Sequence, residues 1–225
     1  MALTKYNRSW RAVALTLAAV AGFTDVQAYL AAGGYFVSFM SGNSTRLGVA
    51  AADADSGVWK LAGIVLCFVG GVALGSIGDA FGSRHRRTVV LLLTSLLLSL
   101  SAVFQRPDFA YTGVLLMALA MGALNAVFVA DSEVHVGITY MTGTLVKLGR
   151  HLGERLRGGV TKSWLPYAQH WAALVIGGVL GTLAIRQSVP HALWMPAIAT
   201  AGMAVVVNRL SRNAAALNEE SKNQQ

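Results

Sequence analysis

Apolar residues gather in six long stretches along the chain, and polar residues gather between them. The stretches cover residues 11–31, 58–78, 88–104, 110–130, 165–185 and 191–207. A helix needs about 20 mostly apolar residues to cross roughly 30 Å of hydrocarbon. Each stretch is close to that length, so the pattern predicts an all-α, polytopic membrane protein. It would have about six transmembrane helices, with the lipid bilayer as its main partner.

Two shorter stretches, residues 35–49 and 136–148, are only half apolar. One lies between the first and second predicted spans, and the other lies between the fourth and fifth. Both are too short and too polar to cross the bilayer as helices. We expect each to be either a re-entrant segment, which enters and leaves the membrane on the same side, or an interfacial segment.

Basic residues fall mainly on one of the two sides that six spans define. Lys and Arg near the ends of spans are retained on the cytoplasmic side of a membrane protein. With the N-terminus inside, fourteen of the 18 basic residues are cytoplasmic, namely Lys5, Arg8, Arg11, Arg84, Arg86, Arg87, Lys147, Arg150, Arg155, Arg157, Lys162, Arg209, Arg212 and Lys222. The other four are Arg46, Lys60, Arg106 and Arg186. Eight crossings would move residues 84–87 outside, so the charges favour six spans with both termini in the cytoplasm.

The composition also indicates a membrane protein. The 225 residues are 55% hydrophobic and 12% charged, with a mean hydropathy of +0.55, whereas soluble domains carry about 25% charged residues. The net charge of +8 would suit a nucleic acid. Because the basic residues lie beside apolar spans, where they serve orientation, we expect no nucleic-acid partner. Cys67 is the single cysteine, so the chain forms no internal disulfide.

An internal repeat divides the chain. Residues 40–48, MSGNSTRLG, return as residues 141–149, MTGTLVKLG, with the hydroxyl-glycine pair, the basic residue and the Leu-Gly ending in register. Two further pairs of segments align at nearly the same offset, 22–25 with 122–125 and 71–75 with 177–181. A single membrane domain, residues 1–225, therefore contains two related copies.

The copies cover about residues 11–105 and 110–208, and a polar tail follows at 209–225. Each copy holds three predicted spans. Because three is an odd number, the second copy must enter the membrane upside down. Two inverted three-helix repeats, each with a broken or re-entrant half-helix, are the plan of many secondary transporters. The tail lacks sustained apolar periodicity, and we expect it to fray.

These motifs resemble those of a known family. The similarity rests on the Gly-x-x-Asp of residues 22–25, on Gly33-Gly34 followed by Phe36 and Val37, on Ser41-Gly42-Asn43 and on residues 141–145, MTGTL. In order and spacing they resemble the YoaK-like family of bacterial membrane proteins, also called domain of unknown function 1275. Ser41 replaces the family's usual Thr and keeps its hydroxyl. The resemblance covers nearly the whole chain and implies a small bacterial inner-membrane protein, of a kind often labelled a predicted permease.

Asp25 is a carboxylate inside the first predicted span. A charged side chain costs roughly 2.5–3.5 kcal/mol at the bilayer centre and less near the interface, so it needs a partner or a water-filled cavity. We expect either a coupling-proton or ligand site, or a helix-end carboxylate that pairs with Arg46 or caps a nearby half-helix. Its repeat mate, Asn125, cannot titrate, so Asp25 is the candidate if protons are coupled.

The segments at residues 41–45 and 142–144 combine glycine with short hydroxyl and amide side chains that cap helices. Each predicts a helix break followed by a helix start. A half-helix N-terminus inside a membrane directs free N–H groups into a cavity, where they can bind an anion or a carboxylate. Re-entrant segments from opposite faces would bring both tips together near the midplane. The alternative is a pair of interfacial loops whose basic residues face headgroups.

We therefore predict a substrate site at these breaks, with two basic residues adding positive charge one turn further on. The predicted substrate-binding residues are Asp25, Ser41, Gly42, Asn43, Thr45, Asn125, Thr142, Gly143 and Thr144, and the basic residues are Arg46 and Lys147.

The sequence offers no catalytic constellation. The histidines His85, His151, His170 and His191 lie near predicted segment ends or in loops, without a nucleophile and an acid beside them. Asp131, Glu133 and His135 alternate, but no second cluster completes a metal site. We expect no enzyme activity, no metal and no cofactor.

The leading hypothesis is a small secondary transporter or permease for an unidentified small solute, anionic or zwitterionic. The alternative is a non-transporting membrane scaffold or regulatory subunit, held together by the glycines of residues 71–75 and 177–181, which suit close helix packing. Six spans make a small transporter, for which a homodimer is a candidate assembly.

Overall fold

The structure is a computed structural model that describes residues 8–31, 33–77, 83–104, 107–130, 133–134, 137–158 and 163–223. Its helices are α1 (Arg8–Ala31), α2 (Met40–Ala52), α3 (Val58–Ile77), α4 (Ser83–Phe104), α5 (Ala110–Asn125), α6 (Met141–Leu156), α7 (Leu165–Gln187) and α8 (Val189–Asn223). Two short 3-10 turns, η3 (Pro107–Phe109) and η4 (Ala126–Phe128), flank α5. Two strands of two residues each, β1 (Val129–Ala130) and β2 (Glu133–Val134), pair antiparallel.

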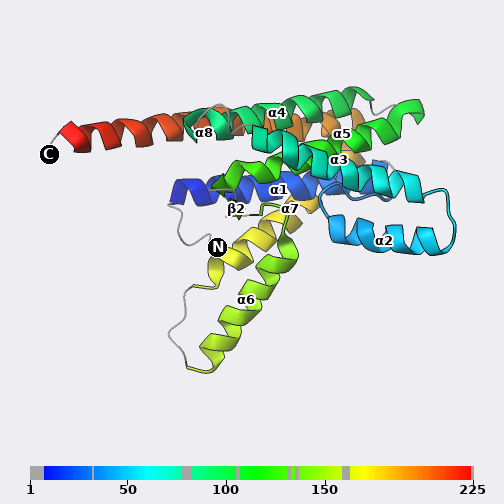
Figure 1. Ribbon diagram of the computed structural model, residues 1–225, viewed down its shortest axis with the longest axis horizontal. Helices are drawn as coiled ribbons and strands as arrows, with labels where there is room; N and C mark the ends of the chain where they lie inside the picture. The colour runs from blue at the N-terminus through cyan, green and yellow to red at the C-terminus, as the bar shows by residue number, and fades with distance from the viewer. Residues whose placement is uncertain are drawn as a thin grey trace.

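Six of the described helices are long and apolar enough to cross a membrane, namely α1, α3, α4, α5, α7 and α8. They confirm the six predicted spans, and α3, α5 and α7 begin at the predicted residues. The half-apolar stretches form α2 and α6, of 13 and 16 residues. The protein is therefore an all-α, polytopic membrane protein with two additional short helices (Figure 1).

The polar tail differs from the prediction. We expected residues after Asn208 to fray, but α8 continues as a helix to Asn223. The red helix extends past the bundle in Figure 1. Ala, Leu, Glu and Lys dominate residues 214–222, and all four are good helix formers. Because α8 is already formed, each added residue extends a helix without the cost of nucleation.

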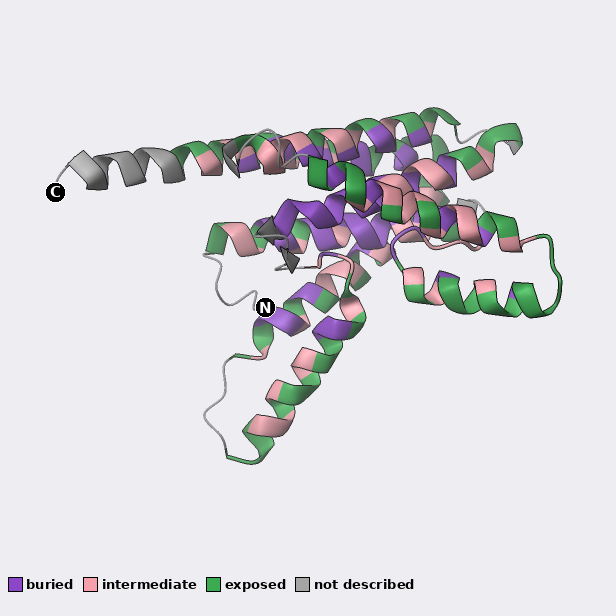
Figure 2. Cartoon of the chain, viewed as in Figure 1, coloured by how far each residue is buried: buried purple, intermediate pink, exposed green. Residues whose placement is uncertain are grey.

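Corresponding spans of the two copies have matching places in the bundle. Buried residues make up 61% of the apolar window of α1 and 72% of that of α5, against 22% for α3 and 17% for α7. The third spans, α4 and α8, are equal at 33%. The first span of each copy is thus central and the second is peripheral. Figure 2 shows the buried residues gathered on the middle helices.

Each central helix packs on a peripheral helix of the other copy, α1 on α7 and α5 on α3. Glycines let the two backbones touch. A β-carbon on Gly22 of α1 would clash with the carbonyl oxygen of Leu174 in α7. A β-carbon on Gly122 of α5 would clash in the same way with the carbonyl oxygen of Phe68 in α3. The aligned glycines of residues 22 and 122 therefore make equivalent contacts.

Glycines of the peripheral helices also lie against the backbone of the central helices. A β-carbon on Gly177 of α7 would clash with the carbonyl oxygen of Ala19, and one on Gly71 of α3 would clash with that of Leu119. The aligned glycines of residues 71 and 177 thus face the first span of the opposite copy. The two copies thus make equivalent glycine contacts with each other. Their first spans, α1 and α5, run in opposite directions along the bundle (Figure 1).

A side chain of α1 completes the hydrogen bonding of α8. Pro196 lies inside α8 and has no N–H, so the carbonyl of Ala192, four residues earlier, loses its helical donor. Gln27 of α1, which is fully buried, donates from Nε2 to this oxygen at 2.6 Å. The interrupted helix is therefore tied directly to the central helix.

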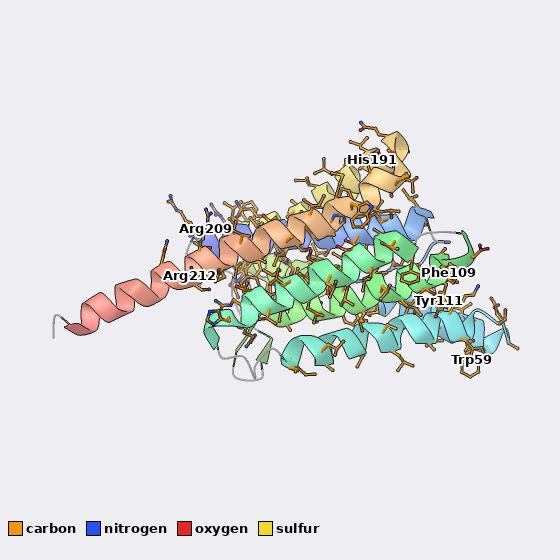
Figure 3. The ribbon with its side chains drawn as sticks, turned by 90° about the horizontal axis from the view of Figure 1, so that it is seen from above. Trp59, Phe109, Tyr111, His191, Arg209 and Arg212 are labelled. Carbon is orange, nitrogen blue, oxygen red and sulfur yellow. The ribbon has the colours of Figure 1, made fainter. Side chains whose placement is uncertain are left out.

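The two ends of the bundle differ in chemistry. Trp59, Phe109, Tyr111 and His191 lie at one end, and Arg209 and Arg212 lie toward the other (Figure 3). At the basic end, the guanidinium of Arg87 lies 4.3 Å from the centre of the Trp10 ring. Arg87, Arg209 and Arg212 thus lie toward one end of the bundle, as the positive-inside rule leads one to expect of a membrane protein, and aromatic residues lie at both ends.

Close packing at Gly177 predicts a large effect of a small side chain. We expect Gly177→Val to destabilise the protein by about 1–3 kcal/mol or more, because the added atoms meet backbone that cannot move aside. Gly202→Val is the matched control, since a β-carbon at Gly202 of α8 meets nothing within 4 Å. Thermal unfolding of the purified variants in detergent measures the effect, and equal losses in both variants would contradict the packing.

The bond from Gln27 to Ala192 predicts a coupling with Pro196. We expect Gln27→Leu to cost about 1–3 kcal/mol, because it leaves a buried carbonyl unpaired. In a Pro196→Ala background the helix regains an N–H for that carbonyl, so the same change should cost less. A double-mutant cycle on unfolding free energies measures the difference. An identical cost in both backgrounds would disprove the coupling.

Candidate functional site

The two half-helices begin at the same cavity. The cavity has a volume of about 760 Å³ and is lined by residues 38–41 at the start of α2 and by Thr139, Tyr140, Met141 and Thr142 at the start of α6. We call it the central cavity. From this point α2 and α6 leave the bundle in different directions (Figure 1). The structure therefore brings together two segments about a hundred residues apart in the sequence.

Neither half-helix has the side-chain cap that the sequence predicts. The residues before the helices are Phe39 and Tyr140, and neither makes a capping hydrogen bond. The hydroxyls of Ser44, Thr45 and Thr144 instead donate to carbonyls four residues earlier, at 2.8–3.1 Å. A hydroxyl one turn inside a helix reaches such a carbonyl more easily than an N–H behind it. The predicted capping role of these residues is wrong.

The glycines of the two breaks have the same structural role in both copies. A β-carbon on Gly42 would clash with the ring of Phe39, and one on Gly143 would clash with the ring of Tyr140. Each aromatic ring folds over the glycine three residues after it. The hydroxyl-glycine motif thus makes room for the aromatic residue that precedes each half-helix, and neither glycine lines the central cavity.

Asp25 holds the segment that leads into α2. Its Oδ1 accepts hydrogen bonds from the N–H groups of Val37 at 2.7 Å and Ser38 at 2.8 Å, and its Oδ2 accepts one from the Ser38 hydroxyl. The predicted pairing with Arg46 is not made. Arg46 donates instead to the carbonyl of Gly34 and lies 5.4 Å from the centre of the Tyr35 ring.

Asn125 does the same for the segment that leads into α6. Its Oδ1 accepts from the N–H of Thr139 at 3.3 Å, and its Nδ2 donates to the carbonyl of Met121 at 2.9 Å. Asn43 adds a further tie in the first copy, because its Nδ2 donates to the carbonyl of Phe36 at 2.6 Å. These amides and the carboxylate of Asp25 satisfy backbone that has left the helical conformation.

Asp25 also lines a second cavity of about 450 Å³, together with Phe36, Leu174 and Gly178. Ser38 and Thr139 line both cavities. Asp25 therefore lies beside the central cavity but does not line it.

The charge at the central cavity comes from the second copy. Lys147, in the second turn of α6, lines the cavity, whereas its counterpart Arg46 does not. Further along α6, Arg150 and Glu154 form an ion pair of 3.3 Å. The hydrogen bond from Arg150 lowers the pKa of Glu154, so this carboxylate is charged at neutral pH and offsets Arg150.

His170 is a cavity residue that the sequence interpretation missed. It lies in the second turn of α7, is only 1% exposed and lines the central cavity. Its Nε2 lies 3.2 Å from the carbonyl oxygen of Ile138. The offset that aligns Gly71 with Gly177 also aligns His170 with Ile64. A polar residue in one copy at a position that is apolar in the other copy is the signal that could have identified His170 from the sequence.

The described residues hold no group of three or more His, Cys, Asp or Glu side chains that could bind a metal ion. Asp131 and His135 lie outside the described residues, and so does the side chain of Glu133. The polar side chains that line the central cavity are instead hydroxyls, the amide of Asn125, the imidazole of His170 and the ammonium group of Lys147.

Comparison with known proteins agrees with the motifs. Residues 13–206 match the family described as protein of unknown function DUF1275. The chain belongs to this family. It is also 32% identical over 200 residues to the UPF0700 transmembrane protein RA0705 of Rhizobium meliloti strain 1021, which covers 88% of this chain and 86% of that protein. No solved structure matches the chain. The resemblance carried by the paired breaks is therefore confirmed.

In this DUF1275 protein the predicted site residues fall into three groups. Those that line the central cavity are Ser41, Asn125, Thr142, Thr144 and Lys147. Asp25 lines the second cavity. Gly42, Asn43, Thr45, Arg46 and Gly143 line neither of these two cavities. Gly42 and Gly143 pack under aromatic rings, and Asn43 and Arg46 bond to the backbone before α2. Thr45 is exposed.

The bonds of Asp25 predict which replacements the DUF1275 fold tolerates. Asp25→Asn should lose little stability, because an amide keeps the bonds to Val37 and Ser38 as Asn125 keeps its bonds to Thr139. Asp25→Leu should cost several kcal/mol, since it leaves the N–H groups of Val37 and Ser38 without an acceptor, and each unpaired buried group costs about 1–3 kcal/mol. Thermal unfolding of both variants measures the difference. Equal destabilisation would mean that the negative charge, and not the hydrogen bonding, is required.

Proposed function

We propose that this protein is a small secondary transporter of the bacterial inner membrane, and that its solute binds in the central cavity. The observation that carries the proposal is the meeting of two half-helix N-termini, one from each copy, at one cavity. Such paired breaks are where transporters with inverted repeats hold their substrates. We propose transport without catalysis, cofactor, metal or nucleic-acid partner.

The relation between the copies supports an inverted topology. Their first spans run in opposite directions (Figure 1), and their glycines make reciprocal contacts. Transporters of this plan expose one site to each side of the membrane in turn, by moving one bundle of helices against another around the site. The proposal therefore requires the central cavity to be reachable from both sides.

The chemistry of the cavity supports a small solute with an anionic group. Lys147 contributes a positive charge. The first-turn N–H group of Thr142, a residue of the cavity lining, has no hydrogen-bond acceptor within the part of the chain that the structure describes. A helix N-terminus of this kind attracts negative charge. In the proposed orientation the basic end of the bundle, with Arg209 and Arg212, faces the cytoplasm.

Access to Thr142 tests the proposal. Cys67 is the single cysteine, so a Cys67→Ala background is free of thiols. In it, Thr142→Cys puts a thiol in the wall of the central cavity. We expect a membrane-impermeant maleimide to label this thiol both from outside intact cells and from the cytoplasmic side in inverted vesicles. Labelling from one side alone would favour the scaffold or regulatory subunit over a transporter.

Two exposed serines provide the controls. Ser56 follows α2 and Ser163 precedes α7, and both are exposed. In the proposed orientation Ser56→Cys is labelled only from outside and Ser163→Cys only from the cytoplasmic side. If these two exchange sides, the orientation is wrong, but the result for Thr142→Cys still decides on transport.

A further inference from the structure

Helix α6 carries an apolar stripe on its outer side. Leu145, Leu152 and Leu156 follow one another at intervals of seven and four residues, so they lie on one face of the helix. All three are exposed, and Leu156 is 89% exposed. Figure 1 shows α6 projecting from the bundle, and Figure 2 shows exposed and half-buried residues along most of it. The stripe therefore has no cover within the part of the chain that the structure describes.

The opposite side of α6 is polar and lies against the protein. Thr144 and Lys147 line the central cavity. His151 stacks on Tyr167 of α7, with 5.3 Å between the ring centres. A helix on the surface of a soluble protein has the reverse arrangement, with its apolar side inward. Polar residues inward and leucines outward suit a helix whose outer side faces the acyl chains of lipid.

The far end of α6 carries cations that the protein does not neutralise. Arg150 pairs with Glu154 at 3.3 Å, which offsets one positive charge. Arg155 and Arg157 follow, both are exposed, and neither has an acidic partner among the described residues. Arg155 lies three residues after Leu152, so the two side chains are neighbours on the helix surface. We call Leu152, Arg155, Leu156 and Arg157 the α6 tip.

The length of α6 places the tip at the depth of lipid headgroups. The helix starts at the central cavity, which Phe68, midway along the span α3, also lines. At about 1.5 Å per residue, Leu152 lies roughly 16 Å and Arg155 roughly 21 Å along the axis from Met141. Half of the hydrocarbon core is about 15 Å thick. A tilted α6 that starts near the middle of the bilayer therefore ends among headgroups.

The equivalent helix of the first copy has no such end. Its one basic residue, Arg46, donates to the carbonyl of Gly34, and no further basic residue follows in α2. The chain after α2 carries Asp53 and Asp55 instead. An exposed apolar side chain is present, since Val49 is 59% exposed. The two half-helices thus share contact with acyl chains but differ in charge, and only α6 is complementary to an anionic headgroup.

We infer that the α6 tip is a binding site for an anionic phospholipid. Arg155 and Arg157 bind the headgroup phosphate, for which the guanidinium fork is well suited, and Leu152 and Leu156 pack on an acyl chain. A free phosphate ion would leave both leucines uncovered, so the surface fits a lipid. The site lies outside the central cavity, and it is independent of whether the protein transports a solute.

Aligned glycines of the two half-helices provide matched probe positions. Gly48 of α2 and Gly149 of α6 correspond in the repeat, both are exposed, and a β-carbon on either meets nothing within 4 Å. In the Cys67→Ala background, Gly48→Cys and Gly149→Cys each take one bimane label. The full-length protein is placed in phosphatidylcholine bilayers that contain a little phosphatidylglycerol or phosphatidylcholine with a nitroxide on its acyl chain, and fluorescence quenching reports the lipid beside each label.

At Gly149→Cys we expect phosphatidylglycerol to be preferred over phosphatidylcholine about fivefold or more, the factor that one arginine near a membrane surface contributes. At Gly48→Cys we expect no preference. Equal quenching by the two lipids at Gly149→Cys would overturn the inference. An equal preference at both positions would also overturn it, because the anionic lipid would then gather around the whole protein. Neither comparison requires a variant of the tip.

Replacing the two arginines tests the α6 tip itself. In the Gly149→Cys protein, Arg155→Gln with Arg157→Gln should abolish the preference and leave the unfolding temperature in detergent unchanged, since both side chains are exposed. Arg209→Gln with Arg212→Gln is the matched control, because these exposed arginines lie on α8 (Figure 3).

The α8 control should keep the preference at Gly149→Cys. A preference that survives the loss of Arg155 and Arg157 would overturn the assignment to the tip, and so would a preference that disappears equally in the α8 control. Excess inorganic phosphate should leave the preference in place. If phosphate removes it, the tip is a site for a free anion and the assignment to lipid is wrong.

Discussion

The placement of the two half-helices depends on hydrogen bonds that two side chains of the central helices accept from backbone N–H groups outside the helical conformation. Lipid offers no partner to an N–H group, so a chain interrupted at membrane depth must find one within the protein. Asp25 of α1 supplies it before α2, and Asn125 of α5 supplies it before α6. Because α1 and α5 are both central, the two half-helices start beside one another. The cavity between them is a consequence of that placement.

The sequence predicts the spans well because apolar length is a direct requirement of the bilayer. It locates α2 and α6 less well: the half-apolar stretches begin five residues before each helix, and residues 41–45 and 142–144, predicted as helix breaks, are helical. The sequence prediction fails where a second local interaction competes with the predicted one. The hydroxyls at Thr45 and Thr144 bond to carbonyls behind them and leave the caps empty. At the C-terminus, helix propensity and an existing helix outweigh low hydrophobicity.

The site is less predictable because its chemistry depends on contacts between copies. Arg46 and Lys147 occupy equivalent positions in the repeat, but only the second lines the central cavity. The difference arises at Gly33 and Gly34, whose φ angles of +90° and +81° form a turn in the first copy. The carbonyl oxygen of Gly34 then accepts a hydrogen bond from the guanidinium of Arg46. His170 reaches the cavity from α7 through helix packing, which no local motif describes.

The glycine contacts between copies have a mechanical consequence. The backbones of α1 and α7 touch, as do those of α3 and α5, and each of these pairs joins one helix from each repeat. Close backbone contacts therefore join helices of different repeats. If each of these pairs stays together, the proposed transport cycle would move the α1–α7 pair against the α3–α5 pair, and the unit of duplication would differ from the unit of motion.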